Sequence, residues 1–252
     1  MVVGLEKFRE YFAGHEDQYA VIGGAACDLL FDAAGLPFRA TKHIDMVLCV
    51  EVVDAAFGEK FKTFLGAGRY EAREHSDGKK EFYRFHRPKD KGFPFMIELF
   101  SRKPETLTLR NDAGLTPIPV DEDVVSLSAI LLDDSYYEAM QSAKRVVEGV
   151  TVVDETLLIP FKARAFLDLS ERVAKGEKID SKNIKKHRAD VFRLAQLLPR
   201  DATIKLGEPI VADLKHFLDL AAKDDTLDLK SFGVPFQRDE AVALLRSVYG
   251  LG

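Results

Sequence analysis

The segment that most constrains the fold is a short apolar run that leads directly into a glycine pair and a helical pattern, YAVIGGAACDLLF. Residues 20–22 are typical of a buried strand, and residues 25–31 of the helix that follows it. Gly23 and Gly24 form the tight turn between them. A glycine pair before a helix exposes backbone N–H groups at the positive end of the helix dipole, where phosphate groups bind. The segment therefore predicts an α/β fold with a phosphate site.

A second strand is predicted over residues 43–48, HIDMVL. The loop before it carries cationic and hydroxyl side chains that suit phosphate oxygens: Arg39, Thr41 and Lys42. Because side chains alternate along a strand, His43 and Asp45 lie on the same face. Imidazole and carboxylate groups are metal ligands. The glycine turn, the basic loop and these two residues together indicate a nucleotide-and-metal site.

Another acidic residue lies in a strand predicted over residues 93–100, FPFMIELF, where Glu98 interrupts an apolar run. A buried carboxylate is costly unless it is paired or bound to a cation. Two interpretations are open. Glu98 is either an edge-strand side chain that faces water or a metal ligand beside Asp45 on a neighbouring strand.

The remaining patterns divide the chain into an α/β domain, residues 1–153, and a helical domain, residues 154–252. In the first domain, further helices are predicted over residues 4–13, 54–65 and 133–148, and strands or extended segments over residues 70–75, 80–86, 107–120 and 150–153. Residues 124–132 are apolar and expected to be buried. Asp77 and Gly78 indicate a hairpin turn. The fold class is thus α/β (α+β), with a mixed sheet and a C-terminal helical domain.

In the second domain, helices are predicted over residues 158–175, 181–198, 208–223 and 238–248. Pro160 is expected in the first turn of its helix, where proline is tolerated. Lys162 lies in the apolar stripe of this helix, so it either extends its ammonium to water at the stripe's edge or reaches a phosphate. On the next helix, Lys186, Asp190 and Arg193 share a face, which taken alone is typical of a solvated charge ladder.

Composition excludes several classes. Hydrophobic residues make up 46% and charged residues 31% of the 252 residues, as in an ordinary globular protein. No apolar run of about 18 residues is present, so no membrane span is expected. The acidic, amphipathic N-terminus is unlike a signal peptide, and we expect a cytoplasmic protein whose two cysteines are buried thiols. The net charge of −5 argues against a general nucleic-acid coat.

Four blocks in order, RATKHID, IELF, LIPFKARAFLDL and KKHRADVFRL, resemble the AbiEii/AbiGii-type nucleotidyltransferases, which share the fold of DNA polymerase β. The resemblance implies transfer of a nucleoside monophosphate from an NTP to an acceptor hydroxyl or phosphate, with tRNA or another RNA as acceptor. It also implies an antitoxin protein partner, because many members are toxins. Catalytic roles fall on Asp45, Glu98 and Lys162; nucleotide binding on Gly23, Gly24, Arg39, Thr41, Lys42, Lys162 and Asp190; and Mg²⁺ or Mn²⁺ on Asp45, Glu98 and His43.

His43 departs from the family pattern, which has aspartate at this position. Imidazole suits Zn²⁺ or Mn²⁺ better than Mg²⁺. Three accounts are open: another metal, weak activity with Asp45 and Glu98 alone, or a chain without catalysis. The alternative to an enzyme is therefore a nucleotide- or partner-binding relative, and a small-molecule transferase of the aminoglycoside-modifying type is a further alternative.

Overall fold

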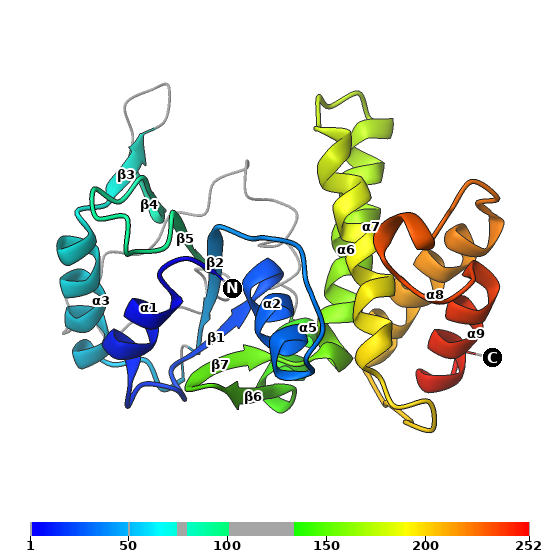
Figure 1. Ribbon diagram of the computed structural model, residues 1–252, viewed down its shortest axis with the longest axis horizontal. Helices are drawn as coiled ribbons and strands as arrows, with labels where there is room; N and C mark the ends of the chain where they lie inside the picture. Colours follow the sequence, from blue (N-terminus) through cyan, green and yellow to red (C-terminus); the bar gives the residue numbers. More distant parts are fainter. Residues whose placement is uncertain (1, 50, 75–79, 101–133, 252) are drawn as a thin grey trace. The chain divides into compact units, whose positions relative to one another are not determined.

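The computed structural model of the protein describes residues 2–49, 51–74, 80–100 and 134–251. The chain divides into two compact units (Figure 1). Unit 1 comprises Met1–Leu132 and Lys144–Val153, and unit 2 comprises Asp133–Ala143 and Asp154–Gly252. The predicted extended segment 107–120 and apolar segment 124–132 lie outside the described residues.

Unit 1 is built on a mixed sheet, as expected for an α/β fold. Its described strands are β1 Tyr19–Ile22, β2 His43–Leu48, β3 Glu71–Glu74, β4 Lys80–His86, β5 Met96–Phe100, β6 Lys144–Val147 and β7 Val150–Val153. They lie in the order β3-β4-β5-β2-β1-β7-β6. β2 is antiparallel to β1 but parallel to β5, and β1 is parallel to β7. The N-terminal ends of β2 and β5 therefore lie at the same end of the sheet as the C-terminal end of β1.

An aromatic core covers one face of this sheet. The helices of unit 1 are α1 Leu5–Phe12, α2 Gly23–Ala33 and α3 Ala55–Gly68. The Phe8 ring of α1 contacts Tyr19 of β1 at 5.4 Å and Phe64 of α3 at 6.2 Å, and Phe61 of α3 contacts Phe85 of β4 at 5.6 Å. Figure 1 shows α2 on the other side of the sheet from α1 and α3.

Charged side chains lie on the second face. Phe85 of β4 points into the aromatic core, so Arg84, the residue before it, points to the opposite face. Its register partner on β5 is Glu98, whose own partner on β2 is Asp45. The sheet thus has an apolar face under α1 and α3 and a row of charged residues on the face where α2 lies.

Within its described residues, the regular elements of unit 2 are all helices. Its elements are α5 Asp134–Ser142, α6 Glu155–Ala174, α7 Ser181–Leu194, η4 Ala195–Leu197, α8 Glu208–Lys223, η5 Lys230–Phe232 and α9 Arg238–Val248. α6 packs on α7 and α8, and α8 packs on α9. Buried aromatic residues join these helices; the rings of Phe192 and Phe217, for example, are 5.8 Å apart.

The prediction of one helix over residues 133–148 is wrong. α5 ends at Ser142, and the chain continues as β6, which pairs antiparallel with β7. A two-residue turn joins these strands at Glu148 and Gly149, which have φ angles of +49° and +76°. Positive φ at both positions is the backbone of a type I′ hairpin turn. This turn allows residues 144–147 to pair with β7 as a strand, which explains why they do not continue the helix.

The position expected for Pro160 is also wrong. α6 begins at Glu155, so Pro160 lies inside the helix and not in its first turn. Proline has no N–H to donate to the carbonyl of Thr156, four residues earlier. The hydroxyl of Tyr249 donates a hydrogen bond to that carbonyl instead, over 2.7 Å. A distant side chain therefore compensates for the helix-interior proline.

Candidate active site

The site is organised by the turn from β1 into α2. β1 ends at Ile22, and Gly23 is already the first residue of α2. Gly23 has φ +70°, a conformation that L-residues rarely adopt. A Cβ built on Gly23 would lie 1.9 Å from Oδ2 of Asp45, so the carboxylate fills the space that a side chain would need. Glycine at this position allows Asp45 to lie directly against the turn.

The loop before β2 lies against the second glycine. A Cβ built on Gly24 would lie 2.8 Å from the Thr41 hydroxyl and 3.6 Å from the Arg39 guanidinium. The guanidinium is held over the ring of Phe38, at 5.1 Å, and that ring contacts Phe31 of α2 at 5.0 Å. The cation is therefore positioned at the beginning of α2 by packing against the helix.

The first turn of α2 has features of an anion site. Its N-cap residue, Ile22, makes no side-chain capping bond, and no acidic residue lies in the first turn. The first N–H groups of a helix have no partner within the helix. They lie beside Arg39 and Thr41, so the dipole and the side chains favour the same negative ligand.

Two acids lie side by side in the sheet next to this turn. Asp45 and Glu98 are register partners on the parallel strands β2 and β5, and both are buried. Arg84 of β4 forms an ion pair with Glu98. The cross-strand row Arg84–Glu98–Asp45 continues to Ile22, the register partner of Asp45 on β1 and the residue before the glycine turn.

The interpretation of Glu98 as an edge-strand residue facing water is wrong, because β5 lies between β4 and β2. Its partner, Arg84, was missed by the sequence reasoning. A buried carboxylate calls for a cation, and alternation along KEFYRFH places Arg84 opposite the aromatic core face. Recognising β4 as the neighbour of β5 would have identified the pair.

Lys42 and His43 lie just before Asp45 in the sequence. The His43 ring stacks on Phe95, with centroids 6.3 Å apart and an angle of 22° between the planes. Lys42 is exposed. The predicted phosphate and metal roles of these two residues stay predictions.

The acidic side chains next to the glycine turn can be compared with the ligands that a metal ion needs. Among the described residues, no group of three or more His, Cys, Asp and Glu side chains could hold a metal by itself. Mg²⁺, however, is commonly bound by one or two carboxylates together with substrate phosphates. The adjacent acids Asp45 and Glu98 fit one cation carried in by a nucleotide, in competition with Arg84 for Glu98.

Lys162 and Asp190 belong to unit 2, where they form an ion pair with Nζ and Oδ2 3.3 Å apart. Their side chains are 2% and 0% exposed. Arg193 also pairs with Asp190, over 3.1 Å. The interpretation of Lys162 as a residue reaching water at the stripe's edge is wrong, and so is a solvated position for Asp190. Their nucleotide-binding roles stay predictions.

The comparisons with known proteins identify no family. No family model, no curated protein and no solved structure matches the chain. The resemblance to the AbiEii/AbiGii-type nucleotidyltransferases therefore rests on the sequence blocks alone. No helix within the described residues has the length and apolar character needed to span a membrane.

Proposed function

We propose that unit 1 binds a nucleoside triphosphate and transfers its nucleoside monophosphate to an acceptor hydroxyl or phosphate, releasing pyrophosphate. The observation that carries the proposal is the convergence on the glycine turn: Asp45 lies against Gly23, and Arg39 and Thr41 lie against Gly24. An anion site and a buried carboxylate in such proximity suit a ligand that brings phosphates and a cation together. The four sequence blocks support the same reaction.

In this proposal the phosphates bind at the beginning of α2. The first-turn N–H groups donate to phosphate oxygens. Arg39 contributes a guanidinium, which can bind two phosphate oxygens at once, and its packing on Phe38 reduces the entropy lost on binding. Thr41 contributes a hydroxyl donor, and the exposed Lys42 adds positive charge.

The acids act next to the phosphates. Asp45 and Glu98 would hold one Mg²⁺ or Mn²⁺, which supplies charge neutralisation of the triphosphate and activation of the acceptor hydroxyl. Arg84 orients Glu98 through their ion pair. It also places a fixed positive charge beside the reacting phosphates, and preorganised charge of this kind stabilises a transition state.

A second candidate function is nucleotide binding without catalysis. The ion pair from Arg84 to Glu98 and the stacking of His43 on Phe95 favour it, because both engage side chains that the resemblance assigns to metal. The two functions predict the same phosphate site. They differ in whether bound NTP is converted to pyrophosphate and a nucleotidylated acceptor.

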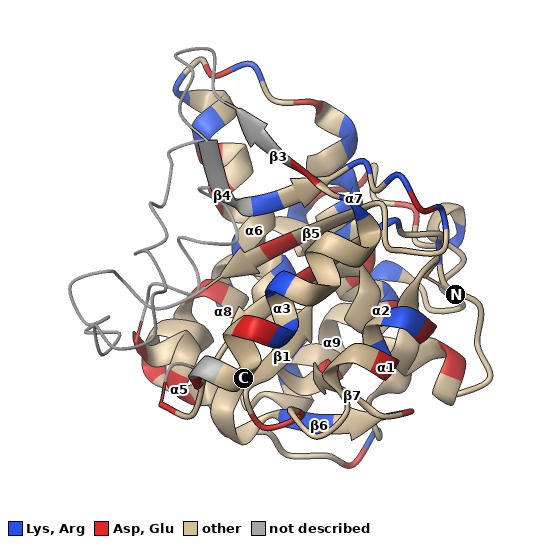
Figure 2. Cartoon of the chain, turned by 90° about the vertical axis from the view of Figure 1, so that its left-hand side faces the viewer, with Lys and Arg blue, Asp and Glu red and all other residues tan. Residues whose placement is uncertain are grey.

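An RNA acceptor such as tRNA, and an antitoxin partner, are proposed from the resemblance alone. Blue and red segments are interspersed along the helices and strands in Figure 2, and the net charge is −5. An RNA acceptor would thus bind through a few cations, and the salt dependence of its affinity would report their number.

The experiment is a calorimetric titration of ATP, with Mg²⁺ and with EDTA, followed by an assay of pyrophosphate release in the presence of tRNA. Asp45→Asn tests the acid, and Asp32→Asn, an exposed acid at the other end of α2, is the matched control. We expect metal-dependent binding and pyrophosphate release in the wild type and the control, and loss of both in Asp45→Asn. Binding without pyrophosphate release would favour the second function. Absence of ATP binding would contradict both.

A further inference from the structure

Phe95 is an exposed aromatic residue at the end of the sheet where the candidate site lies. It directly precedes β5, the strand that carries Glu98, and is 48% exposed. By comparison, the phenylalanines that α1 and α3 contribute to the aromatic core are buried: Phe8, Phe12, Phe57, Phe61 and Phe64. Phe95 is therefore not part of the aromatic core and leaves much of its ring accessible at this end of the sheet.

The exposed ring is supported from within the molecule. Phe95 stacks on the imidazole of His43, with 6.3 Å between centroids and 22° between planes. The Phe95 carbonyl accepts a hydrogen bond from the backbone N–H of Arg87, over 3.0 Å, which fixes the residue next to the end of β4. An aromatic ring backed by a second ring and anchored through its backbone presents a flat apolar surface at low entropic cost.

The position of Phe95 relative to the phosphate site follows from the sheet. β1 ends at Ile22, at the same end of the sheet where β2 begins at His43 and β5 begins at Met96. Adjacent strands are about 4.8 Å apart, so β1 and β5 are about 10 Å apart. The glycine turn and Phe95 therefore lie at the same end of the sheet, separated by a distance that a nucleotide can span, and the strand that carries Asp45 lies between them.

We propose that Phe95, backed by His43, stacks on the nucleobase of the triphosphate whose phosphates bind at Gly23 and Gly24. This inference rests on the proposed function and specifies which part of the substrate each side of the site contacts. It also accounts for His43, which serves as a ring in the base platform instead of a metal ligand. Stacking on a flat aromatic surface tolerates every base, so the site accepts all four NTPs.

The chain contains no tryptophan, which allows a direct test. Phe95→Trp introduces a single indole at the platform, and Val52→Trp introduces one at a residue of similar exposure, 44%, beyond the far end of β2. We expect ATP to quench the fluorescence of Phe95→Trp but not of Val52→Trp. Inorganic tripolyphosphate, which has no base, should bind without quenching. Equal quenching in both variants, or quenching by an RNA oligonucleotide but not by ATP, would overturn the proposal.

Affinity gives the second readout. Calorimetry on Phe95→Ala should show the Kd for ATP raised by about 5-fold to 150-fold, the range reported for base stacking on an aromatic side chain. The Kd for tripolyphosphate should stay as in the wild type. If tripolyphosphate binds but Phe95→Ala leaves the ATP affinity unchanged, the base platform is wrong and the phosphate site stands. If neither ligand binds to the wild type, both the platform and the proposed function are wrong.

Discussion

Asp45 of β2 and Glu98 of β5 face the same side of the sheet as register partners on adjacent parallel strands. Like charges in that relationship repel each other, and both side chains are buried. Arg84 offsets the repulsion from the third strand through its ion pair with Glu98. In the proposed function, a cation held by Asp45 and Glu98 would share Glu98 with Arg84, so the stability of unit 1 should depend on ligand binding.

Arg84→Gln should expose this link. The substitution leaves a buried charged acceptor without its cation, so we expect a loss of about 1–3 kcal/mol in the free energy of unfolding. Mn²⁺ should then raise the Tm of the variant more than that of the wild type, because the cation binds to carboxylates that no longer compete with a guanidinium. Arg84→Lys keeps a positive charge and is the control. Equal Mn²⁺ responses in the wild type and Arg84→Gln would contradict the prediction.

Gly23→Ala should reduce both the stability of unit 1 and its affinity for ATP. A residue with a side chain costs about 1–2 kcal/mol in the left-handed region. Gly35→Ala is the matched control, because its φ of +68° is close to the +70° of Gly23 and a Cβ there would meet nothing within 4 Å. We expect urea denaturation to show a larger loss for Gly23→Ala, since its Cβ displaces the Asp45 carboxylate. Calorimetry should show loss of ATP binding in that variant alone.

Substitution of Lys162 and substitution of Asp190, which form the buried ion pair of unit 2, should reduce the free energy of unfolding by different amounts. Asp190 has two cationic partners, Lys162 and Arg193, so Lys162→Met leaves the carboxylate paired. Asp190→Asn instead leaves a buried ammonium without its anion, which costs about 3–5 kcal/mol. Lys175→Met, at an exposed ion pair with Glu171, is the control and should leave the free energy of unfolding nearly unchanged, because exposed pairs contribute little. Equal losses for Lys162→Met and Asp190→Asn would show that Arg193 does not compensate.

The hydrogen bond that compensates for Pro160 can be tested by a double-mutant cycle. Tyr249→Phe leaves the Thr156 carbonyl without a donor, so we expect a loss of about 1–3 kcal/mol. Pro160→Ala restores the backbone N–H to that carbonyl. Tyr249→Phe should therefore cost much less in the Pro160→Ala background. Additive losses in chemical denaturation would mean that the hydroxyl and the missing N–H are unrelated.

Helices and strands with a strong local pattern of apolar residues could be predicted from the sequence. Residues 43–48, 208–223 and 238–248 were predicted with the bounds that the structure has, because alternation or helical periodicity is strong in each. One of the two interpretations of Glu98 placed it beside Asp45 on a neighbouring strand, and this adjacency is present. Both cysteines are free and buried, as predicted.

Features that depend on contacts between distant segments of the chain could not be predicted from the sequence. The strand β6 was predicted as part of a helix, because Glu148-Gly149 is a weaker turn signal than Asn-Gly and β6 exists through its pairing with β7. Arg84 could not be assigned to Glu98 before the order of β4, β5 and β2 was known. Likewise, Lys162 and Asp190 lie on different helices, and periodicity within each helix does not show that they meet.

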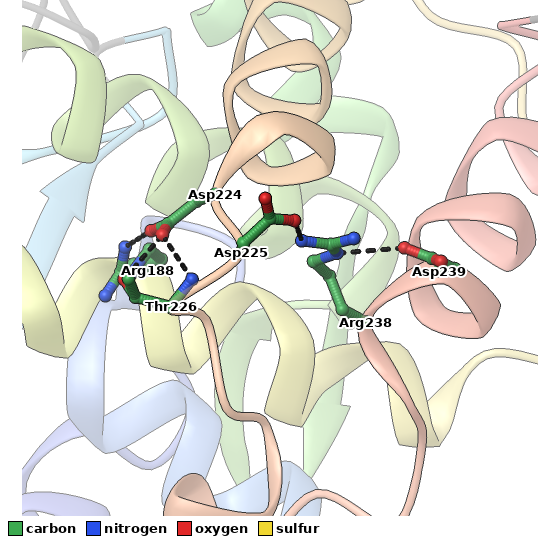
Figure 3. Close-up of polar contacts among 6 residues, drawn as sticks. All are labelled: Arg188, Asp224, Asp225, Thr226, Arg238 and Asp239. Atoms are coloured by element: carbon green, nitrogen blue, oxygen red, sulfur yellow. Dashed lines mark hydrogen bonds and ion pairs between the residues drawn. The ribbon is translucent and has the colours of Figure 1, made fainter.

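The stability of unit 2 should depend on pH through Asp224, which Figure 3 shows beside Arg188 and Thr226. The Thr226 hydroxyl donates a hydrogen bond to the carboxylate over 2.6 Å, and this bond, with a smaller contribution from Arg188, holds the pKa of Asp224 below its usual range. The folded state therefore binds fewer protons than the unfolded state. The stabilisation is fully present above the unfolded-state pKa of about 3.9 and is lost as the pH falls through the lower folded-state pKa.

Urea denaturation should show Asp224→Asn less stable than the wild type at pH 7, with the difference shrinking below pH of about 4. Asp225→Asn is the control, because Asp225 is 92% exposed beside Arg238 and such a pair contributes little. A difference between wild type and Asp224→Asn that stayed constant down to pH of about 2 would contradict the assignment.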